Sequence, residues 1–318
     1  MERRPLGRSG VEVPVLGFGC GGSARLMVGD DHAARVAAVE AAIECGINYF
    51  DTAPAYGDGR SEANLGAVLA DVGSPPVTLS TKVVLREEEL ARPRDAVLRS
   101  VEESLRRLRV DRVEMLLLHN RIFRDRPSGR RVGVGPALGL GDVLEPGGVM
   151  DGFQELLRAG TIAACGFTTL GGDPSAIREV LDSGEASVIN AALSLVEPTS
   201  AWAVAPPAGG DDHGQVVPAA QARGIGVIAV RVFGSGRLLV APTEEATATL
   251  QGMAAELGGG DVIRGSLAFA LGTPGVGTAV IGFSEEAHVR QAASAVREGL
   301  PELPSTADLI DRLNAVGS

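Results

Sequence analysis

Short apolar runs alternate with amphipathic segments along most of this chain, and that alternation limits its fold more than any other feature. In each cycle, a strand-like run precedes a segment whose apolar residues recur at the helical period. The expected strands span residues 15–19, 47–51, 77–82, 113–119, 161–167, 187–190, 226–230 and 278–281. Consecutive strands joined through a helix run parallel to each other. Eight such cycles predict an α/β fold of the (β/α)8 TIM-barrel type.

The segments outside these cycles predict additions to the barrel. Residues 4–16, with Gly10 near the turn, indicate an N-terminal β-hairpin, and residues 242–260 and 305–316 indicate extra helices toward the C-terminus. Long connections at about 121–148 and 195–215 interrupt the rhythm, and structureless loops of this length are typically lids or binding loops. Because barrels routinely reach about 250 residues or more as one unit, we expect a single domain over residues 1–318.

The charge and the cysteines exclude several classes of function. A formal net charge of −11 and a pI near 5.0 disfavour nucleic acid or an anionic membrane as a partner, because both are polyanions. Cys20, Cys45 and Cys165 are widely spaced and form no CxxC pattern, so we expect buried reduced thiols and no metal site. No secretion signal or membrane-length apolar run is present, which favours a cytoplasmic location.

Lys82 is the only lysine in 318 residues, and it ends the third predicted strand. Arginine serves as well as lysine for a surface cation, so the exception suggests a site that needs the amine itself. Asp51 ends the strand before it and His119 ends the strand after it, each about one strand–helix unit away. The carboxyl ends of barrel strands share one rim, which is where barrel enzymes carry their active sites. Tyr56, in the loop after Asp51, would lie at the same rim.

These four side chains together suggest acid–base chemistry on an oxygen. Free tyrosine has a pKa of about 10, and a neighbouring ammonium lowers it by stabilising the phenolate. We therefore expect Lys82 to lower the pKa of Tyr56, Asp51 to hold Lys82 in place, and His119 to orient a substrate oxygen. This equipment suits a carbonyl compound or an alcohol.

Several sequence motifs of this chain resemble those of the aldo-keto reductases. The resemblance rests on residues 46–57, with Glu62 and Gly66, and on residues 80–83, 111–119, 158–167, 224–229 and 278–284. It extends over nearly the whole chain. It implies a (β/α)8 barrel, a nicotinamide cofactor, and a catalytic tetrad of Asp51, Tyr56, Lys82 and His119 in which Tyr56 donates the proton during reduction.

The resemblance also implies cofactor contacts, with departures from the usual pattern. Thr168, Thr169 and Asn190 stand where the family holds the carboxamide with Ser-Asn and Gln, and Val230, followed by Arg231, replaces an aromatic that often stacks on the nicotinamide. The other implied contacts are Gly19, Cys20, Gly234, Gly236, Arg237, Gly282, Phe283, Ser284, His288 and Gln291. The family default is NADP. No basic residue for its 2′-phosphate is evident beyond Ser284, so NAD stays open.

Three alternatives remain beside this interpretation. Gly17, Gly19 and Gly22 satisfy GxGxxG, but no helix begins at the third glycine, which argues against a Rossmann loop. Lys82 could instead form a Schiff base in a lyase or aldolase, and some relatives of this fold are nicotinamide-binding regulatory subunits.

The arginines at 121, 124, 126, 130 and 131 suggest a solvated loop face. The expected partner is a small carbonyl compound or alcohol, such as a sugar or natural-product ketone; the sequence does not set the oligomeric state.

Overall fold

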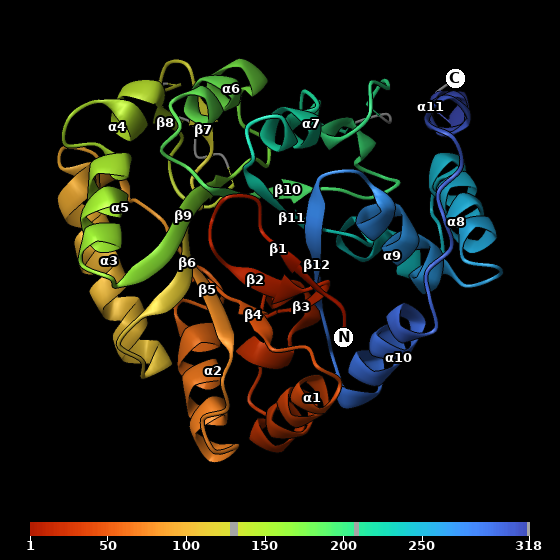
Figure 1. Ribbon diagram of the computed structural model, residues 1–318, viewed down its shortest axis with the longest axis horizontal. Coiled ribbons are helices and arrows are strands. Elements are labelled where there is room, and N and C mark those ends of the chain that lie inside the picture. Colours follow the sequence, from red (N-terminus) through yellow and green to blue (C-terminus); the bar gives the residue numbers. More distant parts are fainter. Residues whose placement is uncertain (128–132, 207–209, 317–318) are drawn as a thin grey trace.

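The computed structural model describes residues 1–127, 133–206 and 210–316, and eight parallel strands within them close into a barrel (Figure 1). Neighbouring strands follow the order of the chain all the way round, and the last strand pairs with the first. The barrel strands are β3 (Leu16–Gly19), β4 (Tyr49–Asp51), β5 (Thr78–Val83), β6 (Val113–Leu118), β9 (Ile162–Thr168), β10 (Val188–Ala192), β11 (Gly226–Val230) and β12 (Val276–Gly282).

Helices surround this barrel and cover its outer face (Figure 1). They are α1 (His32–Glu44), α2 (Arg60–Asp71), α3 (Pro93–Leu108), α5 (Val149–Arg158), α6 (Pro174–Asp182), α7 (Val216–Gln221), α9 (Val262–Gly272) and α10 (Glu286–Arg297). The predicted additions are present as α8 (Glu245–Leu257) and α11 (Thr306–Val316). The (β/α)8 barrel predicted from the alternation is thus confirmed.

Local sequence explains why these helices form and which face they bury. The Asp31 carboxylate accepts a hydrogen bond from the Ala34 amide, a side-chain cap at the start of α1. Along α3, Val97, Val101 and Leu108 recur at helical spacing and are buried against the barrel. Burial of such a stripe stabilises a helix that would be marginal alone.

The N-terminal hairpin closes one end of the barrel. Its strands, β1 (Arg3–Pro5) and β2 (Glu12–Pro14), pair antiparallel around a turn that contains Gly10, and they lie over the centre of the ring in Figure 1. Leu6 and Val13 are buried with interior barrel residues such as Met115 and Leu117. Leu16 belongs to β3, so the hairpin ends earlier than predicted. Because this end is plugged, the opposite, carboxyl-terminal rim is where a small molecule would enter.

Neither long connection is structureless throughout. The first contains a short parallel pair, β7 (Ile122–Phe123) with β8 (Leu138–Gly139), and helix α4 (Leu140–Leu144); its residues 128–132 lie outside the described part. Asn120 fastens this connection, because its amide oxygen accepts from the Leu85 amide and its nitrogen donates to the Leu85 and Pro136 carbonyls. In the second, whose residues 207–209 are likewise not described, Trp202 packs against Phe269 of α9.

Two further observations concern the chain as a whole. Among the described helices, none combines the length and the apolar character that a membrane crossing demands. All three cysteines are buried and free of disulfide bonds.

Candidate active site

Adjacent strands bring three of the predicted catalytic residues to one rim. Asp51 is the last residue of β4, Lys82 lies one residue before the end of β5, and His119 directly follows β6. The pairing places Asp51 opposite Ser80, and Lys82 opposite Leu117. Parallel strands in this register place the three side chains at one end of the barrel, as the sequence spacing predicted.

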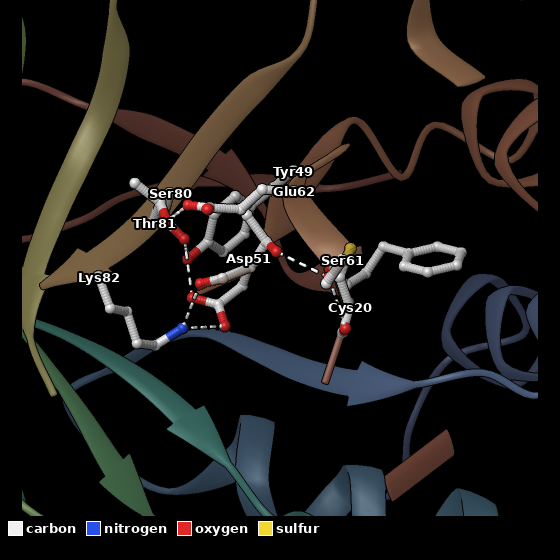
Figure 2. Close-up of polar contacts among 10 residues, drawn as sticks. Cys20, Tyr49, Asp51, Ser61, Glu62, Ser80, Thr81 and Lys82 are labelled. Carbon is white, nitrogen blue, oxygen red and sulfur yellow. Dashed lines mark hydrogen bonds and ion pairs between the residues drawn. The ribbon is translucent and has the colours of Figure 1, made fainter. Parts of the chain in front are cut away.

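Lys82 and Asp51 form a buried ion pair (Figure 2). Lys82 Nζ donates to Asp51 Oδ1 at 2.6 Å and to the Thr52 carbonyl at 2.7 Å, and the two side chains are only 1% and 5% exposed. Burial, the largest single influence, lowers the pKa of Lys82, but the charges and hydrogen bonds of Asp51 and Tyr56 together outweigh it, and the pKa is raised. The amine is therefore held as an ammonium at neutral pH.

Two residues that the sequence analysis missed hold the other side of Asp51. Ser80 Oγ donates to Asp51 Oδ2 at 2.7 Å, and the Tyr49 hydroxyl lies 3.0 Å from Ser80 Oγ (Figure 2). Strand alternation was the available signal, because Tyr49 precedes Asp51, and Ser80 precedes Lys82, by two positions each. Such pairs share a strand face, so polar residues there were predictable neighbours of the site.

The loop that carries Tyr56 is tied down at its far end. Ser61 Oγ donates to the Cys20 carbonyl at 2.8 Å and lies 2.8 Å from Thr52 Oγ1. The buried Glu62 carboxylate accepts from Thr81 Oγ1 at 2.5 Å and from Arg107 Nε at 2.7 Å. These bonds fix the start of α2 against β5, and with it the loop between Asp51 and Ser61.

Tyr56 lies between Lys82 and His119. The Lys82 ammonium is 5.1 Å from the centroid of the Tyr56 ring. The rings of Tyr56 and His119 meet edge to face, with centroids 5.7 Å apart. A Cβ placed on Gly21 would be 3.7 Å from Tyr56 Cζ, so the chain after β3 passes beside the hydroxyl end of the ring. Asp51, Tyr56, Lys82 and His119 thus form one cluster.

The predicted effect on the pKa of Tyr56 is only partly correct. Burial raises the pKa of the phenol, the Lys82 charge lowers it, and burial dominates, so the net shift is upward. The prediction of a lowered value was wrong because it omitted the cost of placing a phenolate in an enclosed site. A neutral phenol at physiological pH is nevertheless the form that can donate a proton.

His119 is held in its neutral form. Burial, followed by the neighbouring Lys82 charge, lowers the pKa of the imidazole to about 3. Its Nδ1 atom is enclosed and has no hydrogen-bond partner among the described residues. A neutral imidazole has one donor and one acceptor nitrogen, so His119 can meet a substrate oxygen without a change of charge.

A His119→Asn variant should lose less stability than the native chain when the pH is lowered from about 7 to about 4. The imidazole has a pKa of about 3 in the folded protein and about 6.5 in the unfolded chain, so only the unfolded state gains its proton in this window. The free energy of unfolding therefore decreases as the pH falls, and asparagine removes that part of the slope. Denaturant titrations of both proteins at several pH values measure it; equal slopes would contradict an enclosed neutral imidazole.

Two predicted carboxamide contacts have the properties of an unfilled polar site. Thr168 and Asn190 are 7% and 2% exposed. Thr168 Oγ1 and Asn190 Oδ1 are both buried and without a hydrogen-bond partner in the described structure. Buried polar atoms without partners are costly and call for an explanation. A primary carboxamide, with both donors and an acceptor, fits them. Thr169 is different, because its hydroxyl already donates to the Asn190 carbonyl.

Other predicted cofactor residues are less free to make polar contacts. The Cys20 amide donates to the Asp51 carbonyl, its own carbonyl accepts from Ser61, and the pKa of its thiol is raised by burial. The Phe283 ring is buried and packs against Phe18 at 4.9 Å between centroids. Their contribution to a cofactor would come from van der Waals contact or, for Phe283, from the backbone. Gly19 is buried at the end of β3.

The predicted phosphate and adenosine contacts occupy the loops after β11 and β12. Gly234, Gly236 and Arg237 lie in a helical turn, Gly234–Leu239, and Val230 ends β11 half-exposed. Arg231, at φ 57°, is ion-paired with Glu197 at 2.9 Å. After β12, Gly282 and Gln291 are exposed, and Ser284 Oγ lies 2.9 Å from His288 Nδ1.

Sites of other kinds gain no support. An open groove of about 770 Å³ lies outside the barrel, beside the start of α3 and α4. Three of its four arginines are already paired with carboxylates, Arg94 with Glu155, Arg124 with Glu179 and Arg126 with Asp142. Among the described residues, no three His, Cys, Asp or Glu side chains are close enough together to hold a metal ion.

The chain is a TIM-barrel protein whose rim holds an ammonium, a phenol and a neutral imidazole close together. The model of the Aldo/keto reductase family matches residues 15–303, and the chain belongs to that family. Members of this family are oxidoreductases that use nicotinamide cofactors.

Solved structures of the family share the whole fold. An aldo-keto reductase from Bacillus halodurans, in its holo form, superimposes with a TM-score of 0.75 at 22% identity, over 100% of this chain and 97% of that one. A structure described as a putative aldo-keto reductase from Pseudomonas aeruginosa gives a TM-score of 0.63 at 25% identity, over 92% and 95%.

Among curated relatives, pyridoxal 4-dehydrogenase of Microbacterium luteolum is 28% identical over 272 residues, which cover 76% of this chain and 73% of the relative. L-galactose dehydrogenase of Arabidopsis thaliana is 38% identical over 124 residues, which span 38% of each chain. D-threo-aldose 1-dehydrogenase of a Pseudomonas species is 33% identical over 138 residues, 35% of this chain and 41% of the relative. The last two matches thus span less than half of those relatives.

Proposed function

We propose that this protein is an NAD(P)-dependent oxidoreductase that interconverts an aldehyde or ketone and its alcohol. The observation that carries the proposal is the cluster of Tyr56, His119 and the Lys82–Asp51 ion pair at the open rim of the barrel. A positioned phenol beside a fixed ammonium can move a proton to or from a carbonyl oxygen. Thr168 and Asn190, with their unpartnered polar atoms, would hold the carboxamide of the cofactor at the same rim.

In this proposal each side chain has a defined task. Bound nicotinamide supplies or accepts the hydride at the substrate carbon. Tyr56 donates its proton to the carbonyl oxygen during reduction and accepts it during oxidation. Lys82, held by Asp51, offsets the negative charge that develops on the phenol oxygen. His119, neutral at every physiological pH, fixes the substrate oxygen beside the phenol.

The residues expected near the cofactor's adenosine phosphate do not by themselves select NADP or NAD. NADP is the family default and our first expectation. The carboxylate of Glu285, however, lies 3.4 Å from His288, and Arg290 is paired with Glu286 and Glu44. Acidic neighbours weaken the attraction for a 2′-phosphate. Parallel titrations with NADPH and NADH decide between the two cofactors.

The names of the curated relatives support a polyhydroxylated or ring-bearing substrate. They are called dehydrogenases of L-galactose, of D-threo-aldoses and of pyridoxal. We therefore propose that a sugar-like or aromatic carbonyl compound, or its alcohol, is the small-molecule substrate, and that oxidation should be assayed as carefully as reduction.

A Schiff-base mechanism at Lys82 finds less support. A nucleophilic lysine needs its neutral amine, usually through a lowered pKa. Here the pKa of Lys82 is raised, and the amine is bonded to Asp51 and to the Thr52 carbonyl. A regulatory subunit that binds nicotinamide without turnover is the remaining alternative, and the following assay separates it from an enzyme.

The test is a cofactor titration followed by a panel of aldehydes, ketones, sugars and their alcohols, read by nicotinamide absorbance in both directions. Saturable binding of NADPH or NADH together with turnover of at least one compound supports an oxidoreductase. Tight binding without turnover across the panel supports a regulatory role. No binding of either cofactor overturns the proposal.

An Asn190→Leu variant should bind the nicotinamide cofactor about 3- to 10-fold more weakly, because one hydrogen bond to the carboxamide is lost. Leucine is similar to asparagine in size and adds no unpaired buried polar atom, so the fold should be retained. Quenching of protein fluorescence measures the dissociation constant. An unchanged constant would remove Asn190 from the cofactor site.

A further inference from the structure

Arg121 stands out among the basic residues of the described chain. Several arginines of the described chain are buried or half-buried. Among these, Arg121 is the one whose guanidinium makes no ion pair or hydrogen bond within the described structure. Its neighbours Arg124 and Arg126 form the predicted solvated loop face, because both are exposed. They pair with Glu179 and Asp142, respectively. Arg121 is half-exposed, so it is less open to solvent than Arg124 and Arg126. The remaining arginines of the set, at 130 and 131, lie outside the described residues.

Two glycines from different loops enclose the Arg121 side chain. A Cβ on Gly133, in the connection after β6, would approach Arg121 Nε to 2.8 Å, and one on Gly171, after β9, would approach its Cζ to 2.6 Å. Both glycines have positive φ, at 74° and 65°, so other residues there would be strained as well as crowded. The guanidinium is therefore held between two backbone segments. Arg121 is half-exposed, so its N–H donors stay open to solvent and to a ligand.

The position of Arg121 relates it to the proposed reaction centre. It follows His119 by two residues, and Gly171 follows Thr168 by three. Because Leu118 pairs with Phe167, His119 and Thr168 are the next residues along neighbouring strands. His119 Nδ1 and Thr168 Oγ1 are the unpartnered atoms already described. The half-exposed Arg121 guanidinium thus follows, two residues along the chain, a residue with an unpartnered polar atom at the end of β6.

The phosphates of the cofactor are not the expected ligand of Arg121. The proposed phosphate contacts follow β11 and β12, and β12 is four strands away from β6 in either direction round the barrel. A cofactor whose pyrophosphate lies there and whose carboxamide meets Thr168 and Asn190 leaves the end of β6, with His119 and the connection that follows it, to the substrate.

We propose that Arg121 binds an anionic group, a carboxylate or a phosphate, on the substrate of this oxidoreductase. The inference rests on the proposed function and adds to it the substrate class: a carbonyl compound or alcohol that carries a negative charge away from its reacting carbon. A planar guanidinium with parallel N–H donors suits either anion. In a chain with a net charge of −11, the site also supplies the local positive potential that such a substrate needs.

The kinetic test compares matched substrates in the holoenzyme. One pair is 4-carboxybenzaldehyde and 4-nitrobenzaldehyde; the other is glyceraldehyde 3-phosphate and glyceraldehyde. Arg121→Gln should lower kcat/KM about 10- to 100-fold for the anionic member that the site accepts, mainly through KM, and leave the neutral member within about twofold. Arg121→Lys should recover part of the loss. Arg106→Gln, at an exposed arginine on α3, is the matched control and should change neither. The pair that responds identifies carboxylate or phosphate; equal effects on both members of both pairs overturn the proposal.

A binding measurement separates this inference from the reaction itself. Terephthalate and inorganic phosphate are titrated calorimetrically into the cofactor-loaded native protein and into Arg121→Gln. At least tenfold weaker binding of one anion to the variant supports the site even if no aldehyde is turned over. Equal binding of both anions by the two proteins, or no binding by the native protein, contradicts the site whether or not the enzyme is active.

Discussion

A Tyr56→Phe variant should lose carbonyl reduction almost completely, with kcat lower by about 10³-fold, while it still binds the nicotinamide cofactor. The reason is that the phenol oxygen is the group placed to exchange a proton with the substrate, and a positioned general acid typically contributes about 10²–10⁴-fold. Phenylalanine keeps the ring that meets His119 edge to face, so the shape of the site is retained. Steady-state rates in both directions and a fluorescence titration of cofactor binding measure the two quantities.

The control for this variant is Tyr49→Phe, at the other tyrosine of the chain. Tyr49 is buried behind Ser80 and reaches Asp51 only through it, so its loss should reduce kcat far less than the loss of Tyr56. If Tyr56→Phe reduces carbonyls at the native rate, Tyr56 is not the proton donor. If both variants lose activity equally, the effect reflects the network and cannot be assigned to the Tyr56 hydroxyl.

A Lys82→Met variant should lose both activity and stability, unlike Tyr56→Phe. Without the ammonium, the Asp51 carboxylate remains buried with Ser80 as its side-chain partner. Breaking a buried ion pair from one side typically costs about 3–5 kcal/mol of the free energy of unfolding. Denaturant titrations of the variant and the native protein at about pH 7 measure the loss.

The double variant Asp51→Asn/Lys82→Met separates the two effects. It leaves no unpaired buried charge, so most of the lost stability should return. Its activity should stay low, by about 10²-fold or more, because the developing charge on Tyr56 is no longer offset. Recovery of activity together with stability would show that the ion pair serves only the fold. If Lys82→Met is as stable as the native protein, Lys82 and Asp51 do not form a buried ion pair.

The barrel was predictable because each of its signals is local. Helical periodicity in 93–108, strand runs such as 226–230 and the Asp31 cap each depend on neighbouring residues. Since βα units of one hand repeat round a closed sheet, eight cycles leave few other arrangements. The long connections were less predictable. The β7–β8 pair joins residues about sixteen positions apart, and Asn120 bonds to Pro136 across the same distance.

In the candidate site, the sequence identified the side chains but not their electrostatics. Strand ends one unit apart brought Asp51, Lys82 and His119 together as predicted. The pKa of Tyr56, by contrast, depends on how much water is excluded, and that follows from all the surrounding segments at once. The surroundings of Arg121 likewise depend on segments far apart in sequence, since Gly133 and Gly171 approach its side chain from two different loops.

The sequence by itself determined the fold class, the family and the gathering of the four candidate side chains at one rim, because periodicity and the order of strand ends are local properties of the chain. The tertiary structure decided the protonation states, the hidden support from Tyr49 and Ser80, and the absence of any described partner for the Arg121 guanidinium. Those properties depend on burial and on contacts between segments far apart in sequence, which no local pattern records.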